Sequence, residues 1–213
     1  MTRDVLSREK VLDAALQLAD RHGLGGLSMR KLAAELGVEA MSLYNHVANK
    51  ADLLDGMAGR VFEGIALPDP GLPWEERLRA LACGAFAAFT AHPEVVQALA
   101  ADQANPRSIG ALRFIDAVLA ALLDAGIDER TAARRYRSLF GLLFGSVLVG
   151  SVDLTGGGRP AVEPIDEWFK RSVAGARLPN LARVLPALLE LDCGPTFSEE
   201  LEFYIDAIRA ALD

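Results

Sequence analysis

SMRKLAAELGVEAMSLYNHVANK, residues 28–50, is the stretch that decides the fold. Ser28 is a favoured helix N-cap residue, and the apolar residues after it recur at helical spacing on one face. These residues are Leu32, Ala33 and Leu36. Gly37 suits the left-handed backbone of a tight turn, after which a second short helix is expected over about residues 39–46. The stretch therefore predicts a helix-turn-helix.

The second of these helices has side chains suited to the major groove of DNA. Leu43 and Val47 are expected to face inward, so the opposite face is free to meet base edges. Ala40 and Met41 suit contact with a thymine methyl group, and Asn45 suits pairing with the N6 and N7 atoms of adenine. Ser42 is expected on the same outward face. This pattern favours a sequence-specific DNA reader.

Neighbouring polar residues are placed to contact the DNA backbone. Tyr44, His46 and Lys50 are expected at phosphates, and Arg30 at a phosphate or a guanine. The alternative is an ordinary helical hairpin in which Tyr44 and His46 are half-buried core residues. The full set of predicted DNA-binding residues is Ser28, Arg30, Ala40, Met41, Ser42, Tyr44, Asn45, His46 and Lys50.

The composition predicts an all-α cytoplasmic protein. Hydrophobic residues make up 51% of the 213 residues, which is enough for a sizeable core and disfavours disorder. Alanine and leucine dominate, which favours helix over strand. No secretory signal or membrane span is recognised, and Cys83 and Cys193 have no metal-ligand spacing, so both are expected to be reduced thiols.

The charge is unevenly distributed along the chain. The net charge is −7, but residues 1–50 carry seven Lys and Arg against six Asp and Glu, while residues 51–213 carry fifteen against twenty-three. A near-neutral reader on an acidic body contacts phosphates locally, while the body is repelled from the duplex.

Helix boundaries are predicted from caps and breaks along the chain. Ser7, Asn49 and Asp128 are expected as N-caps, and the Asn105-Pro106 pair is expected to open another helix. Breaks are expected at Gly23, at Gly126, at PDPGLP (68–73) and in a loop over 153–164, and the last helix is expected over 198–212. We expect nine or ten helices in two domains. These are a helix-turn-helix domain over 1–67, including the linking fourth helix, and a regulatory domain over 68–213.

Residues 7 to about 57 resemble the DNA-binding domain of the tetracycline-repressor (TetR) family of bacterial regulators. The matching residues are LSMRKLA (27–33), LGV (36–38), LYNHV (43–47), Asn49, Lys50 and LLD (53–55). WEERL (74–78) and FSEELEFYIDAIRAAL (197–212) are similar to the regulatory domain of the tetracycline-repressor branch. The resemblance implies backbone contacts at Tyr44, His46 and Lys50, and a C-terminal domain that dimerises and holds a small ligand.

The helix predicted over 128–152 contains Gly141, Gly145 and Gly150. Each glycine inside a helix costs about 1 kcal/mol relative to alanine, and close approach of a second helix is one reason to accept that cost. A two-fold four-helix interface with the last helix is therefore predicted at Gly141, Gly145, Leu201, Tyr204 and Ile208. The alternative is room for a bulky neighbour, or for ligand, inside one subunit.

Aromatic residues in the C-terminal half are candidate ligand contacts. They are Phe86, Phe89, His92, Phe114, Phe140, Phe144 and Trp168. The alternative is plain core, with two or three of them at most touching a ligand. No catalytic motif, cofactor loop or metal-ligand spacing is found, so neither an enzyme nor a cofactor nor a metal is expected.

These features together predict a DNA-binding transcriptional regulator, namely a homodimeric repressor. It would bind a palindromic double-stranded operator and release it when a small apolar ligand binds. A ligand-sequestering helical protein without DNA binding, and an activator, are the alternatives.

Overall fold

The computed structural model describes residues 5–151, 165–176, 178–190 and 193–212, which form eleven α-helices and no strand. The helices are α1 (Arg8–Gly26), α2 (Met29–Leu36), α3 (Ala40–Leu43), α4 (Lys50–Glu63), α5 (Trp74–Ala91), α6 (Pro93–Ala100), α7 (Ile109–Asp124), α8 (Glu129–Ser151), α9 (Ile165–Gly175), α10 (Pro179–Glu190) and α11 (Cys193–Arg209). The all-α prediction is confirmed, with one or two more helices than expected. The loop predicted over 153–164 lies outside the described residues.

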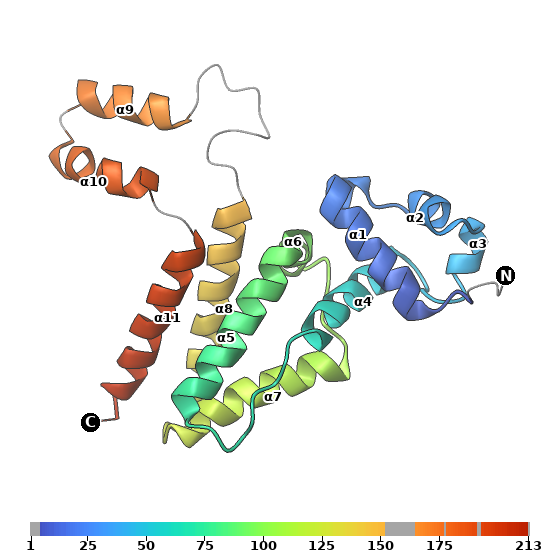
Figure 1. Ribbon diagram of the computed structural model, residues 1–213, viewed down its shortest axis with the longest axis horizontal. Helices are drawn as coiled ribbons and strands as arrows, with labels where there is room; N and C mark the ends of the chain where they lie inside the picture. The colour runs from blue at the N-terminus through green and yellow to red at the C-terminus, as the bar shows by residue number, and fades with distance from the viewer. Residues whose placement is uncertain (1–4, 152–164, 177, 191–192, 213) are drawn as a thin grey trace.

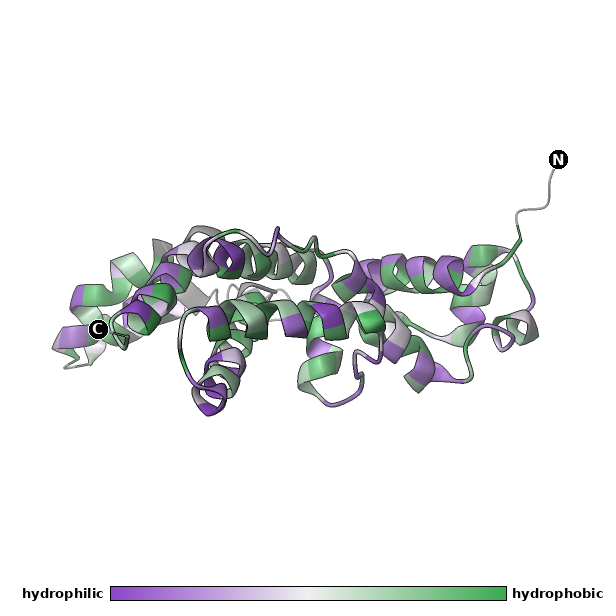
Figure 2. Cartoon of the chain, turned by 90° about the horizontal axis from the view of Figure 1, so that it is seen from below, coloured by the Kyte–Doolittle hydropathy of each residue, from purple (hydrophilic) through white to green (hydrophobic). Residues whose placement is uncertain are grey.

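The molecule is elongated, with α1, α2 and α3 at one end and α8 and α11 toward the other (Figures 1 and 2). We call the first three helices together with the start of α4 the head. Helix α4 runs from the head toward α5 and α7 and packs on α1, α5, α6 and α7. It is therefore the main mechanical link between the two ends.

Side-chain caps fix the starts of α1, α2 and α4. The hydroxyls of Ser7 and Ser28 and the amide oxygen of Asn49 each accept a hydrogen bond from the backbone N–H three residues further on. Each bond satisfies an N–H that a helix end leaves unpaired. The predicted N-caps are confirmed, and so is the left-handed turn at Gly37, whose φ is 65° and ψ is 32°.

Three predicted boundaries are wrong. The last helix spans Cys193–Arg209 instead of residues 198–212. The helix expected from Asn105 begins at Ile109, because Ser108 accepts from the Ala111 amide and caps α7, while the Asn105 amide donates to Asp55. The second helix of the pair ends at Leu43 instead of His46. The backbone then continues as a turn through residue 46.

The rest of the chain forms a second core. Helices α5, α7 and α8 pack on one another, with α6 and α11 against them. Arg77 is buried and its guanidinium donates to Asp124 over 2.6 Å, which ties α5 to the end of α7. Helices α9 and α10 pack mainly on each other and extend beyond the ends of α8 and α11 (Figure 1). No helix in the described segments is long and apolar enough to cross a membrane.

Candidate nucleic-acid interface and regulatory region

A row of exposed side chains lies on α3 and the turn that follows it. Leu43 and Val47 are 0% and 1% exposed and anchor this segment to the head. Met41 is 73% exposed and Tyr44 45%, and Asn45 next to Tyr44 is also exposed. The segment therefore presents an apolar group, a phenol and an amide outward from a fixed base. These are suitable side chains for contacts to base edges and to the backbone of DNA.

The other predicted DNA-binding residues surround this row at different depths. Ala40, Ser42 and His46 are half-buried, and Ala40 packs against the core, so it is less outward than expected. Ser28 is exposed but its oxygen already caps α2. The remaining two residues are exposed: Arg30 near the start of α2 and Lys50 at the start of α4.

Arg8, a residue that the sequence pattern did not single out, holds the turn after α3 in place. Its guanidinium donates to the His46 carbonyl over 2.6 Å and to both carboxylate oxygens of Asp52. Asp52 in turn accepts from the Ala48 amide over 2.7 Å. The hydrogen bond from Arg8 lowers the pKa of Asp52 below its usual value of 3.8. This network fixes the backbone that carries Tyr44 and Asn45.

Four of the seven predicted ligand contacts come together in one aromatic cluster, which also contains Phe62. The cluster consists of Phe62, Phe89, Phe114, Phe140 and Phe144. Phe62, on α4, lies at its centre, with ring centroids 5.3 Å from Phe89 and 5.5 Å from Phe114. Phe62 was not among the predicted ligand contacts. It places the last turn of α4 against the candidate ligand region.

Exposure differs within the aromatic cluster. Phe89 and Phe114 are fully buried, whereas Phe140 and Phe144 on α8 are partly exposed. Of these four rings, only the two on α8 therefore reach the surface.

The other three predicted ligand contacts lie elsewhere. Phe86 stacks on Phe197 of α11, with centroids 4.2 Å apart and an interplanar angle of 4°. The Nδ1 atom of His92 lies 2.9 Å from a carboxylate oxygen of Asp20 in α1, so this residue joins α6 to the head. Trp168 is 46% exposed on α9, which packs on α10. These three residues are not part of the aromatic cluster. Phe86 lies on the same helix as Phe89 but contacts α11, whereas His92 contacts α1 and Trp168 lies on a helix that packs on α10.

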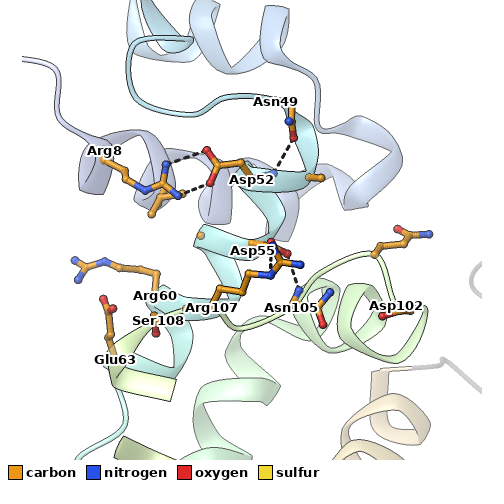
Figure 3. Close-up of a pocket in the computed structure, with 15 residues that line it drawn as sticks. Arg8, Asn49, Asp52, Asp55, Arg60, Glu63, Asp102, Asn105, Arg107 and Ser108 are labelled. Atoms are coloured by element: carbon orange, nitrogen blue, oxygen red, sulfur yellow. Dashed lines mark hydrogen bonds and ion pairs between the residues drawn. The ribbon is translucent and has the colours of Figure 1, made fainter. Parts of the chain in front are cut away.

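A polar junction joins α4 to the segment between α6 and α7 (Figure 3). The Asp55 carboxylate accepts from the Asn105 amide over 2.6 Å and lies 3.7 Å from the Arg107 guanidinium. A groove of about 500 Å³ runs beside these contacts between the head and α7. The walls on either side approach closely, since a Cβ atom at Gly59 would lie 2.9 Å from the Cβ of Ser108. The segment before α7 is therefore in direct contact with α4.

A second junction joins α1 to α6. Besides the Asp20–His92 pair, the Glu94 carboxylate accepts from the Leu24 amide over 3.0 Å. Gly23, just before it, has φ 68° and ψ 168°, which breaks α1 and turns the Leu24 amide out of the helix ladder. The head is thus held to the helices of the second core at two separate places.

The predicted dimer residues divide between open and buried positions. Gly141 and Gly145 lie on an exposed face of α8, and a Cβ atom at either would meet nothing within 4 Å. Leu201 and Ile208 are 0% and 1% exposed, so they pack inside the subunit and are covered by its own side chains. Tyr204 is half-buried.

The hydroxyl of Tyr204 donates to the Arg135 carbonyl over 2.6 Å. The exposed face of α11 instead carries Phe203, which is 73% exposed. Within the described segments, no group of three or more His, Cys, Asp or Glu side chains is arranged to hold a metal ion.

Comparison with known proteins matches both parts of the chain. The family described as "Bacterial regulatory proteins, tetR family" matches residues 11–57, and the family described as "Tetracyclin repressor-like, C-terminal domain" matches residues 67–212. The chain is 42% identical over 99 residues, 45% of its own length, to the HTH-type transcriptional repressor DrrR1 of Streptomyces coeruleorubidus. The matched segments span 35% to 64% of the lengths of four curated relatives, DrrR1 included.

Two solved structures have the same fold over nearly the whole chain. A possible TetR family transcriptional regulator from Streptomyces coelicolor A3(2) is 32% identical, with a TM-score of 0.81, covering 96% of this chain and 100% of that one. The TetR family protein ActR of Streptomyces coelicolor, solved in complex with actinorhodin, is 25% identical, with a TM-score of 0.81, covering 98% and 99%.

Proposed function

The chain belongs to the TetR family of bacterial regulatory proteins, and from this premise we propose that it is a homodimeric transcriptional repressor. It binds a palindromic operator in double-stranded DNA through its head. A small, largely apolar ligand bound in the C-terminal domain releases it. As a reader of bacterial DNA it acts in the cytoplasm.

The single observation that carries this proposal is the exposed row of Met41, Tyr44 and Asn45 over the buried Leu43 and Val47. Because Met41 is already exposed, DNA can cover its side chain without any change in the conformation of the head. Asn45 presents a donor and an acceptor for adenine, and Met41 a surface for a thymine methyl group.

The contacts to phosphate come from the flanks of the row. Arg30 and Lys50 lie at helix starts on either side of α3 and reach the surface. The remainder of the chain is acidic, with a net charge of −8 outside residues 1–50. Electrostatics therefore favour contact with the duplex only through the head.

Two copies of the head are brought together by α8 and α11. The open glycines Gly141 and Gly145 permit close approach of a partner helix, and nothing within the described part of the subunit accounts for their cost to α8. Phe203 on the adjoining helix supplies apolar area for the same contact. A two-fold axis there places two recognition helices for successive major grooves, one helical turn or a multiple apart.

The ligand acts through α4. Phe62 on this helix lies in the aromatic cluster, and Asp55 on the same helix holds the segment before α7. A ligand that displaces Phe140 or Phe144 shifts Phe62 and thereby tilts the head. A tenfold decrease in operator affinity needs only about 1.4 kcal/mol of coupling between the two sites. ActR with actinorhodin is a precedent for a bound small molecule in this fold.

Footprinting on an operator isolated from genomic DNA tests the proposed dimeric binding. We expect two protected half-sites related by a dyad, with centres separated by a whole number of helical turns. A single protected half-site with no dyad would contradict it.

A thermal-shift screen of aromatic compounds, actinorhodin included, tests the ligand site. Compounds that raise the melting temperature should also dissociate the operator complex.

A further inference from the structure

Arg77 carries a buried hydrogen-bond donor that the proposed function does not use. Its side chain is only 8% exposed, and its Nη2 atom donates to Asp124 over 2.6 Å. Its Nε–H group is buried and has no hydrogen-bond partner within the described segments. A buried donor without an acceptor costs free energy, so nearly all such groups in folded proteins are paired. The Nε–H of Arg77 is therefore a candidate donor to a bound molecule.

Arg77 lies in the wall of a pocket of about 360 Å³, here called the α7 pocket. The connection from α4 to α5 forms one side of this pocket and α7 forms another, and Figure 1 shows that connection passing α7 on its way to α5. The volume lies within the range of sites for small organic molecules. The residues that line the pocket are Leu67, Pro68, Pro70, Arg77, Arg113, Asp116, Ala117 and Ala120.

The α7 pocket combines apolar walls with a few charged groups, as sites for small molecules do. Apart from Arg77, Arg113 and Asp116, every lining side chain is apolar. Within the described part of the chain, neither Arg113 nor Asp116 makes a side-chain hydrogen bond or ion pair. Guanidinium groups form strong, directional hydrogen bonds with carboxylates. Two of them beside an apolar wall therefore suit a carboxylate on an apolar body.

We propose that the α7 pocket binds a small organic acid with an apolar body and a hydroxyl group. The Nε–H of Arg77 and the guanidinium of Arg113 donate to its carboxylate, and the apolar walls cover its body. Asp116 accepts from its hydroxyl group. An acid without that group places a second carboxylate near Asp116 with nothing between them, and the repulsion between like charges lowers its affinity.

This site is separate from the aromatic cluster, and no residue of that cluster lines it. On α7 itself, Phe114 is fully buried in the cluster, whereas Arg113 and Asp116 are exposed. The inference therefore goes beyond the proposed function, which needs only one ligand, a largely apolar one. Because Leu67 follows shortly after the end of α4, an occupant of the α7 pocket lies beside the helix that leads to the head.

Calorimetric titration of the full chain with 3-hydroxybenzoate and 4-hydroxybenzoate tests the α7 pocket, with the corresponding hydroxybenzamides as uncharged controls. We expect saturable binding of at least one of the two acids and of neither amide. Arg113→Gln should weaken acid binding about tenfold or more, because it removes a hydrogen bond between charged groups. Arg183→Gln, an exposed change on α10, is the matched control and should leave the affinity unaltered.

Benzoate, which lacks the hydroxyl group, tests the role of Asp116. It should bind wild type more weakly than the better of the two hydroxybenzoates. It should bind Asp116→Asn more tightly than wild type, because the facing negative charge is then absent. Benzoate affinity that is equal in the two proteins would overturn the proposed role of Asp116.

Filling the α7 pocket separates ligand binding from folding. Because Arg77 also pairs with Asp124, its replacement can unfold the chain, so Ala120→Phe is the better variant. It fills the pocket and keeps every charge, and it should abolish acid binding without changing the circular dichroism spectrum. Phe144→Leu, in the aromatic cluster, should leave acid binding unchanged.

Failure of both acids to bind wild type would overturn the α7 pocket, as would binding that survives Ala120→Phe or Arg113→Gln. Binding lost in Phe144→Leu but kept in Ala120→Phe would assign the acid to the aromatic cluster instead. The titration contains no DNA, so its outcome is independent of operator binding.

Discussion

The head and the rest of the chain are both helical, but the head exposes most of its candidate functional side chains, whereas the rest of the chain buries most of its own, wholly or in part. In the head, side-chain caps fix the starts of the helices on either side of α3, and Arg8 and Asp52 hold the turn after it, so that Met41, Tyr44 and Asn45 stay exposed in one geometry. In the rest of the chain, helices bury their aromatic side chains against one another, and Phe89 and Phe114 have no exposed surface at all. A reader of DNA must be rigid and open, whereas a switch needs a packed core that can be rearranged.

The two regions meet at α4, and the two ends of this helix contact different regions. Its first turn carries Lys50 and Asp52, which serve the head, and its last turn carries Phe62, which serves the aromatic cluster. Between them Asp55 contacts the segment before α7. Changes along α4 should therefore pass from effects on DNA to effects on stability.

The largest effect is expected from Phe62→Ala. Removing a buried ring that contacts three others leaves a cavity and should lower the free energy of unfolding by about 3–5 kcal/mol. Met41→Ala, at the exposed end of the comparison, should change it by less than about 0.5 kcal/mol. Urea unfolding of both variants checks this. Equal decreases would mean that the cluster is not the core that joins the domains.

Asp55→Ala is expected to loosen the junction between the regions. The substitution leaves the backbone N–H of Asn105 without its acceptor. It should lower the free energy of unfolding by about 1.5–3 kcal/mol, the usual range for a hydrogen bond to a charged group. Hydrogen exchange should quicken at residues 102–108 and along α4. Asp55→Asn keeps an acceptor oxygen and serves as the matched control. Unchanged exchange in the alanine variant would place the coupling of the two domains elsewhere.

Asn45→Ala should act on specificity and spare the fold. Removal of a bidentate hydrogen-bond pair to adenine costs about 1–3 kcal/mol at one base pair in each half-site and relaxes preference there. Binding to a panel of single-base operator variants measures this. An equal decrease in affinity across the whole panel would assign Asn45 to the DNA backbone instead.

Lys50→Ala should weaken binding to every sequence by a similar factor. Removing one ion pair with a phosphate reduces the slope of log affinity against log salt by about 0.9, so a dimer should show about twice that reduction. Lys50→Arg keeps the charge and should keep the slope. Salt titrations of the three proteins decide the point, and a slope in the alanine variant equal to that of wild type would show that Lys50 does not bind phosphate.

The smallest effect is expected from Asp52→Asn. Arg8 lowers the pKa of Asp52 in the folded protein, so the pair stabilises the head above pH 3.8 and its contribution disappears as the pH falls through the lowered pKa. Because the pair is partly exposed, about 0.5–1 kcal/mol is expected at neutral pH. Unfolding curves of wild type and variant should therefore converge in acid. A constant difference down to pH values well below 3.8 would contradict the ion-pair origin.

Features that depend on neighbouring residues in the chain could be predicted from the sequence. Ser7, Ser28, Asn49 and Gly37 act within three or four residues of themselves, so pattern alone located them correctly. The recognition row was also predicted, because its inward partners Leu43 and Val47 recur at helical spacing. Ala40 was the exception, since whether a small side chain is covered depends on a neighbouring helix.

Contacts between residues far apart in the sequence could not be predicted from helical spacing. Phe62 meets Phe114 from 52 positions away, and His92 meets Asp20 from 72 positions away. An aromatic residue on an apolar helix face has the same local pattern whether it joins a ligand region or an ordinary core. For that reason Leu201 and Ile208 were assigned to a dimer interface, although they lie inside the subunit.

Selection of bound fragments from the source genome tests the central claim, that the exposed row on a fixed head reads DNA sequence. Purified wild type and the Tyr44→Ala, Asn45→Ala double variant would be compared at near-physiological salt. The proposed function predicts that wild type enriches one inverted repeat and that the variant, equally folded by circular dichroism, loses this enrichment. No enriched repeat with wild type, or the same repeat with both proteins, would contradict it.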